Sequence, residues 1–209
     1  YKKPFNGGSI WYSPKKVTAS DGDPYHYFGS SVSMSGDTLV VGATGNDING
    51  IRSGSAYVYV HNAGVWNEQA KILASDGEEE DYFGGAVSIS GDVIAVGTQS
   101  DDVDGVSNVG SVYIYSRVGG VWIEGDGAQA KILASDGDES DGFGKSVFLS
   151  GDTLVVGAPG DDDTILDSGA VYVFTRTDDG WIESQKLKAS DGASNDSFGT
   201  SVSMSGDTI

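Results

Sequence analysis

The chain contains no cysteine and is also poor in proline, histidine and positive charge. Without cysteine, neither disulfides nor thiolate metal sites are available, which excludes a small disulfide-stapled module. His26 and His61 are the only histidines, and no Ser/His/Asp grouping or glycine-rich phosphate loop accompanies them. No apolar run approaches the roughly 20 residues of a membrane span. We therefore expect a protein that is not an enzyme and does not insert into a membrane.

Positive charge is scarce, because 12 Lys and Arg residues face 31 Asp and Glu residues, a net charge of -19. Such a charge repels DNA, RNA and anionic membrane surfaces at long range, so nucleic acid is excluded as a partner. A cationic partner or bound metal ions suit it better. The alternative is that the acidity serves only solubility.

Glycine, by contrast, is frequent, with 32 residues, and apolar residues make up 38% of the chain. Ser-Gly-Asp clusters recur between short runs rich in Val, Ile and Tyr, which predicts many short strands joined by tight turns. We see no amphipathic helix pattern. The fold class expected is all-β.

An internal repeat decides the architecture. An Ala-Ser-Asp-Gly segment recurs about every 55 residues, and a Phe-Gly pair follows nine positions after each of its alanines. The four segments and their pairs are residues 19–22 with Phe28, 74–77 with Phe83, 134–137 with Phe143, and 189–192 with Phe198. A period of this length indicates a solenoid, an array or a propeller.

Each unit contains four candidate strands, which in the first unit are residues 31–34, 39–43, 56–59 and 66–73. The second is a continuous apolar run that suits a strand covered on both faces, and the third alternates with tyrosines that should pack between sheets. Lysines fall on the fourth strand, where we expect them to protect an exposed edge. These are Lys15, Lys16, Lys71, Lys131, Lys186 and Lys188.

Four antiparallel strands per unit make one blade of a β-propeller. Residues 1–209 then form one propeller segment. Its complete blades are predicted at residues 28–82, 83–142 and 143–197, with partial blades at residues 10–18 and 198–209. Gly-Asp pairs such as Gly36-Asp37 supply the hairpin turns between first and second strands.

The Phe-Gly pair is followed about a dozen residues later by Gly157-Ala158-Pro159, or by the degenerate copies at residues 42–44 and 97–99. This order resembles the FG-GAP repeat of integrin α subunits and their bacterial relatives. The resemblance implies a seven-bladed, often calcium-stabilised propeller, used outside the cell or at its surface for adhesion or ligand recognition. WD40 and kelch signatures fit less well.

The resemblance has two consequences. Seven blades of this length need roughly 390 residues, so the remaining blades are expected from the same longer chain or from other copies. In integrins an Asp-rich calcium loop joins the first and second strands, but here that connection is only Ser-Gly-Asp, too short to wrap an ion.

The loops between blades and those between second and third strands should open on one face, which gathers most of the acids. In the inter-blade loops, Asp21, Asp76, Asp136 and Asp191 are equivalent, and an Asx-turn is the favoured interpretation. Five residues later stand His26, Asp81, Asp141 and Asp196, for which loop capping and metal ligation are both open.

The loops between second and third strands carry oxygen ligands near a glycine, a pattern that Ca²⁺ uses. The candidate ligands are Asp47, Asn49, Asp102, Asp104, Asp161, Asp162 and Asp163. The bidentate Glu of an EF-hand loop is missing, so solvated acidic turns are the alternative.

Tyr25, Tyr27 and Tyr82 lie in the acidic loops, where an exposed ring beside Asp81 or Asp141 would stack on a sugar. The alternative is that each folds onto its own blade. Our leading hypothesis is a non-catalytic extracellular adhesion scaffold whose acidic face binds a protein or glycan, with or without Ca²⁺. A structural spacer is the second hypothesis, and a glycoside hydrolase using paired carboxylates is a distant third.

Overall fold

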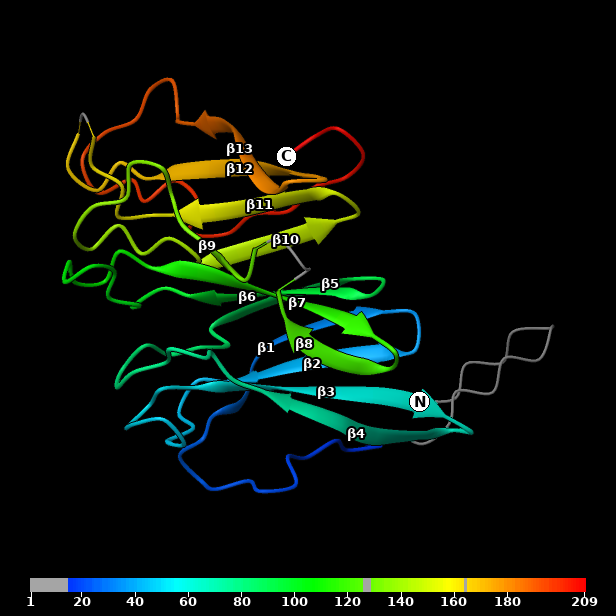
Figure 1. Ribbon diagram of the computed structural model, residues 1–209. Helices are drawn as coiled ribbons and strands as arrows, with labels where there is room; N and C mark the ends of the chain where they lie inside the picture. Colours follow the sequence, from blue (N-terminus) through cyan, green and yellow to red (C-terminus); the bar gives the residue numbers. More distant parts are fainter. Residues whose placement is uncertain (1–14, 126–128, 164) are drawn as a thin grey trace, which may run out of the picture.

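The structure, a computed structural model, describes residues 15–125, 129–163 and 165–209. Three antiparallel sheets lie one above another in chain order (Figure 1), and each has its strands in sequential order. The all-β class and the propeller blades predicted from the repeat are confirmed. Among the described residues, no helix has the length and apolar character needed to cross a membrane.

The strands of the three sheets follow the predicted pattern of four per blade. The first blade contains β1 (Phe28–Ser35), β2 (Thr38–Ala43), β3 (Ser55–Asn62) and β4 (Val65–Ile72). The second contains β5 (Ala86–Ser90), β6 (Val93–Thr98), β7 (Ser111–Val118), β8 (Val121–Glu124) and β9 (Lys131–Ile132). The third contains β10 (Ser146–Ser150), β11 (Thr153–Ala158), β12 (Ala170–Thr177) and β13 (Gly180–Leu187).

The fourth strand of the second blade is interrupted. β8 and β9 both pair with β7, but Gly125, with a φ of 89°, turns the chain away between them. Its N–H still donates to the carbonyl of Ile114. The extra residues of the second blade thus fall between β8 and β9, which both lie on its outer side next to β7.

The core lies between the sheets. β2, β6 and β11 are almost wholly buried, as expected for strands covered on both faces. The third-strand tyrosines, including Tyr57, Tyr113 and Tyr172, are also buried. Phe83 packs edge-on against Tyr113 and Tyr115, and Phe28 and Phe143 make the equivalent contacts in their own blades.

The innermost strands of successive blades lie side by side, with β5 between β1 and β10. They are joined by serine hydroxyls. Ser33 Oγ accepts the Ile89 N–H at 3.1 Å, and Ser88 Oγ accepts the Leu149 N–H at 2.9 Å. These hydrogen bonds satisfy backbone N–H groups of the innermost strands that would otherwise lack a partner.

The predicted partial blades differ from expectation. Residues 10–14 lie outside the described residues, and residues 15–18 form no strand. Residues 198–209 also form no strand, although Ser205 and Thr208 bridge a tight turn like that at Gly36-Asp37. Among the described residues, none forms a strand that pairs with residues 201–205.

Candidate ligand-binding face

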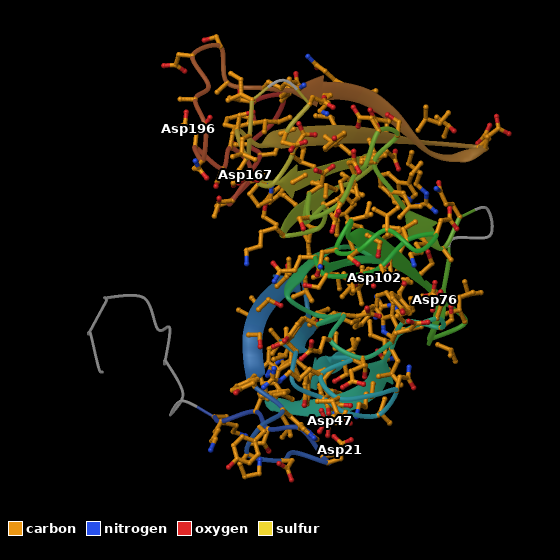
Figure 2. The ribbon with its side chains drawn as sticks, turned by 90° about the vertical axis from the view of Figure 1, so that its left-hand side faces the viewer. Asp21, Asp47, Asp76, Asp102, Asp167 and Asp196 are labelled. Carbon is orange, nitrogen blue, oxygen red and sulfur yellow. The ribbon has the colours of Figure 1, made fainter. Side chains whose placement is uncertain are left out.

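The connections between blades and those between second and third strands gather on one side of the molecule, at the left in Figure 1. We call this side the loop face. Figure 2 views it directly, and acidic side chains from all three blades are spread over it. Those labelled are Asp21, Asp47, Asp76, Asp102, Asp167 and Asp196.

At each junction between blades, a pair of glycines sets how closely the two blades approach at the loop face. Gly42, near the end of β2, lies against the backbone of Gly84, and a Cβ at Gly42 would overlap the Gly84 carbonyl oxygen. Gly97 meets Gly144 in the same way, and Gly157 meets Gly199. The Phe-Gly pair of one repeat is thus seated on the Gly-Ala segment of the repeat before it, which explains why both motifs need glycine.

A serine and a glutamate tie each inter-blade segment to the outer strand of the blade that follows. Glu124 on β8 accepts hydrogen bonds from the Ser75 N–H at 3.1 Å and from the Ser75 hydroxyl at 2.8 Å. The pairs Ser20 with Glu68 and Ser135 with Glu183 repeat this contact. Each segment is therefore held against the blade that it introduces.

The neighbouring aspartate joins a partly buried network of side chains. Asp76 accepts a hydrogen bond from the Tyr113 hydroxyl at 2.5 Å and an ion pair from Lys131 at 2.9 Å. Asp21 contacts Tyr57 and Lys71 in the same way. The Asx-turn interpretation misses these contacts, since these carboxylates bind side chains of the next blade.

The expectation that the lysines protect an exposed edge is wrong for the members that lie in these networks. Lys71, Lys131 and Lys186 do stand on fourth strands, but each reaches inward to aspartates and is only 15–24% exposed. The sequence pattern could not separate the two roles, because each lysine has an aspartate partner 50–55 residues away in another repeat.

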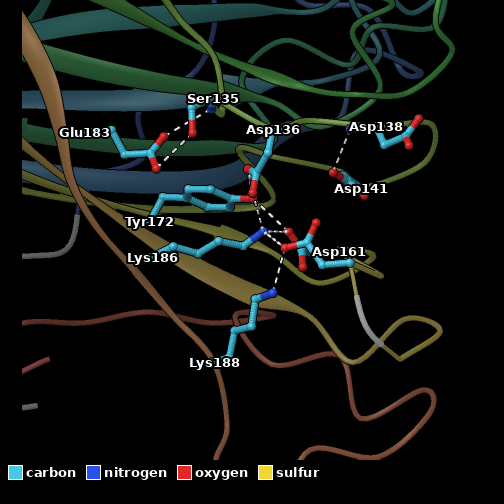
Figure 3. A network of polar contacts seen from close by, with 10 residues as sticks. Ser135, Asp136, Asp138, Asp141, Asp161, Tyr172, Glu183, Lys186 and Lys188 are labelled. Carbon is cyan, nitrogen blue, oxygen red and sulfur yellow. Dashed lines mark hydrogen bonds and ion pairs between the residues drawn. The ribbon is translucent and has the colours of Figure 1, made fainter.

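The third copy of the network is the largest (Figure 3). Lys186 pairs with Asp136 at 2.8 Å, with Asp161 at 2.5 Å and with Asp163 at 2.5 Å, and Lys188 adds a second contact to Asp163. Burial disfavours the charged form of Asp136, but hydrogen bonds from Lys186 and Tyr172 outweigh it and lower its pKa. Asp136 is therefore held as a carboxylate.

Asp81 and Asp141 have a different role, because both are 97% buried beneath the loop face. Asp81 accepts the Glu78 N–H at 2.6 Å and Asp141 accepts the Asp138 N–H at 2.8 Å, which caps each loop from inside. Desolvation raises the pKa of both carboxyls to about 6. Of the two open interpretations, capping is the one that the geometry supports, because each carboxylate accepts a backbone N–H of its own loop.

Comparison with known proteins agrees with this repeated geometry. The sequence profile described as FG-GAP repeat matches residues 11–59, 66–115, 127–174 and 181–209, which is most of the chain. The chain belongs to the FG-GAP repeat family. A search of curated proteins finds no match of significance. FG-GAP repeats form binding or adhesion domains, are generally non-enzymatic, and usually occur in extracellular or surface proteins.

Five of the seven calcium ligands expected in these FG-GAP loops already have partners. Asp47 accepts the Arg52 N–H at 2.7 Å, and Asp102 accepts the Asn108 N–H at 2.8 Å. Asn49 donates to the Ala74 carbonyl. Asp161 and Asp163 pair with Lys186, while Asp162 is exposed and Asp104 stands in a short turn with a φ of 53°.

Within the described ranges no three acidic or histidine side chains come together as a metal site. The residues as arranged therefore do not fit a Ca²⁺ ion, which needs six to eight oxygens. Calcium binding stays a prediction from the resemblance.

The three tyrosines of the FG-GAP loop face are not equivalent. Tyr25 is 74% exposed and Tyr27 is 56% exposed, whereas Tyr82 is half-buried and its hydroxyl accepts a hydrogen bond from Arg52. Tyr27 and Tyr82 have φ values of 52° and 57°, a left-handed conformation that costs energy in a bulky residue. Gly142 takes the corresponding place in the third blade.

Two adjacent cavities open between the blades at the inner rim of the loop face. One, of 340 Å³, lies between the second and third blades, and the other, of 240 Å³, lies between the first and second. Gln99 and Lys145 line both of them. Neither residue is suggested by charge pattern or motif, although each directly follows a motif residue: Lys145 follows Phe143-Gly144, and Gln99 follows Gly97-Thr98.

Proposed function

We propose that this chain is a non-catalytic binding module of an extracellular or surface protein, and that its loop face engages a protein or glycan ligand. The supporting observation is the pair Tyr25 and Tyr27, which stand exposed on the loop face, where acidic side chains gather. Aromatic rings of this kind supply large contact area with a polar end, as binding surfaces require.

The strain at Tyr27 supports the same proposal. The equivalent Gly142 adopts this backbone conformation without cost, so a tyrosine there is not needed for folding. Strained backbone positions cluster at ligand sites because the surrounding structure can hold them there. We infer that Tyr27 is retained for what its ring contacts.

The test exchanges Tyr25 and Tyr27 for the residues at the equivalent third-blade positions, as the double variant Tyr25→Ser with Tyr27→Gly. We expect ligand capture on a glycan array or in a pull-down to fall at least about tenfold, because aromatic anchors carry much of a binding free energy. The melting temperature should stay equal or rise, since strain is removed.

Val118→Ser with Val121→Ser is the matched control, because both residues are exposed on the hairpin that joins β7 and β8. Capture lost equally in the control would show that any apolar contact suffices and would contradict a tyrosine site. If the unaltered chain captured no ligand in either assay, the result would instead favour a structural spacer.

We also propose that a further blade, from a longer chain or from another copy, covers the outward face of the first blade. Gly84 and Gly144 each lie against the preceding blade, but a Cβ at the equivalent Gly29 would meet no described atom within 4 Å. Val32 and Met34 on β1 are 65% and 61% exposed, whereas their counterparts Val87 and Ile89 are buried. The outward face of the first blade thus has the same kinds of residue that the other two blades bury against a neighbour.

A further inference from the structure

The cavities at the inner rim are lined by residues whose identity differs from repeat to repeat, although the motif glycines next to them are the same. The residue after each Phe-Gly pair is Ser30, Gly85, Lys145 or Thr200, and the residue after each Gly-Ala segment is Thr44, Gln99 or Pro159. All but Thr200 line one or both cavities. The motif glycines fix the backbone while the adjoining residues differ, which is how a scaffold presents a specific set of contacts.

Lys145 supplies the charge of this site. The other lysines of the loop face, namely Lys71, Lys131, Lys186 and Lys188, all pair with aspartates. Lys145 is exposed, lines both cavities, and makes no ion pair with any residue that the structure describes. Its ammonium group is available to a ligand.

The carboxylates closest to the cavities are occupied by backbone donors. Asp141, which lines the larger cavity, caps the Asp138 N–H, and Asp102 accepts the N–H of the lining residue Asn108. The remaining polar groups at the cavities are neutral hydroxyls and amides from Ser30, Thr44, Gln99, Ser100, Asn108 and Ser140. Tyr82 adds an aromatic side chain.

From these contacts we propose that the two cavities bind a sugar unit bearing one carboxylate, of the uronic acid type, with Lys145 pairing the carboxylate. This inference rests on the proposed binding function and names its ligand class. A charge-assisted hydrogen bond recognises the carboxylate, the hydroxyls and the Gln99 amide match the sugar hydroxyls, and the Tyr82 ring offers a surface for the C–H face.

Two further observations favour this occupant. The volumes of 340 and 240 Å³ lie at the small end of ligand pockets, so they suit ring-sized units. The net charge of -19 repels acidic peptides and polyanions at long range, so a ligand with one isolated carboxylate among neutral hydroxyls suits the site best.

The test is an NMR titration of the 209-residue chain with methyl β-D-glucuronide and, separately, with methyl β-D-glucoside. We expect the glucuronide to bind at least about tenfold more tightly, the selectivity of one hydrogen bond to a charged group. The shifts should centre on the Gln99 side-chain amide and the Lys145 backbone.

Lys145→Ser introduces the residue of the equivalent Ser30 and should raise the glucuronide Kd about tenfold with no loss of folding. Lys16→Ser removes the same charge from an exposed residue outside both cavities and should leave the Kd unchanged.

Three results would each overturn the inference. They are equal affinity for the two sugars, an unchanged Kd in Lys145→Ser, and no shift with glucuronide up to the highest soluble concentration. Binding of an acidic peptide in place of the sugar would overturn it too. If any of these results came with ligand capture that still depended on Tyr25 and Tyr27, the proposed function would stand and only the ligand class would fall.

Discussion

At the scale of single residues, the buried carboxyls of Asp81 and Asp141 have the largest effect on how the fold responds to pH. Their pKa of about 6 lies above the 3.8 of an unperturbed aspartate, because burial disfavours the charge. The folded state thus holds these protons more tightly than the unfolded state. Both groups therefore add to stability as the pH falls through 6 toward 4.

Asp21, Asp76, Asp136 and Asp163 act in the opposite direction, since their pKa values are lowered by lysine and tyrosine partners. Their contribution is present above the pKa of an unfolded aspartate and is lost as the pH falls below it. We predict that the melting temperature rises from pH 7 to about pH 5 and falls again below about pH 4. A calorimetric series over this range measures both limbs.

The variant Asp141→Asn tests the predicted rise in melting temperature between pH 7 and about pH 5. We expect the variant to be more stable than the unaltered chain at pH 7 by about 1–2 kcal/mol, to lose about half of that advantage by pH 5 and most of it by pH 4. Asp178→Asn, at an exposed hairpin position, removes the same formal charge and should keep the original slope. Parallel profiles for all three proteins would refute the role given to the buried carboxyl.

At the scale of elements, the approach of one blade to the next depends on glycine at the end of each second strand. Gly97→Ala would place a methyl group on the Gly144 carbonyl oxygen, which belongs to the backbone and cannot turn aside. We expect the free energy of unfolding to fall by about 3 kcal/mol, at the upper end of overpacking effects. Urea unfolding of the purified variant measures this loss.

Gly22→Ala is the comparison for that variant, because a Cβ there would meet its nearest atom at 3.5 Å, an ordinary contact distance. The expected change is within about 0.5 kcal/mol. A Gly97→Ala chain as stable as Gly22→Ala would mean that the second strand moves freely relative to the next blade.

The sequence predicted the strands and hairpins better than it predicted the contacts between repeats. Alternation and apolar runs located the strands of each blade, and the Gly-Asp pairs located the hairpins, because these signals are local. Contacts between repeats were missed. Asp81, expected on the ligand-binding face with loop capping and metal ligation both open, is a buried cap, and Lys131, expected to protect an exposed edge, is an ion-pair partner. The partners of Lys131 come from other elements, which local periodicity does not reveal, whereas the Asp81 cap bonds the nearby Glu78 N–H.

At the scale of the whole molecule, the outward face of the first blade leaves Val32 and Met34 in solvent. Exposed apolar side chains on an inner strand favour association. We predict that the 209-residue chain forms concentration-dependent oligomers and that Val32→Thr with Met34→Thr weakens this association. Sedimentation velocity over a concentration series measures it.

Val118→Thr with Val121→Thr changes two apolar side chains of similar fractional exposure on the hairpin between β7 and β8 and should leave association as it was. A stable species of 21.6 kDa at every concentration would contradict the prediction.

The offset between the family repeat and the blade has a consequence for how such proteins evolve. The matches to residues 66–115 and 181–209 begin at Trp66 and Trp181, on or next to the start of a fourth strand, so one repeat carries the outer strand of one blade and the inner strands of the next. Asp76 bonds Tyr113 within its own repeat and Lys131 in the following one. A duplicated repeat therefore arrives with complementary groups for both neighbours, and the array can lengthen by gene duplication without new interface mutations.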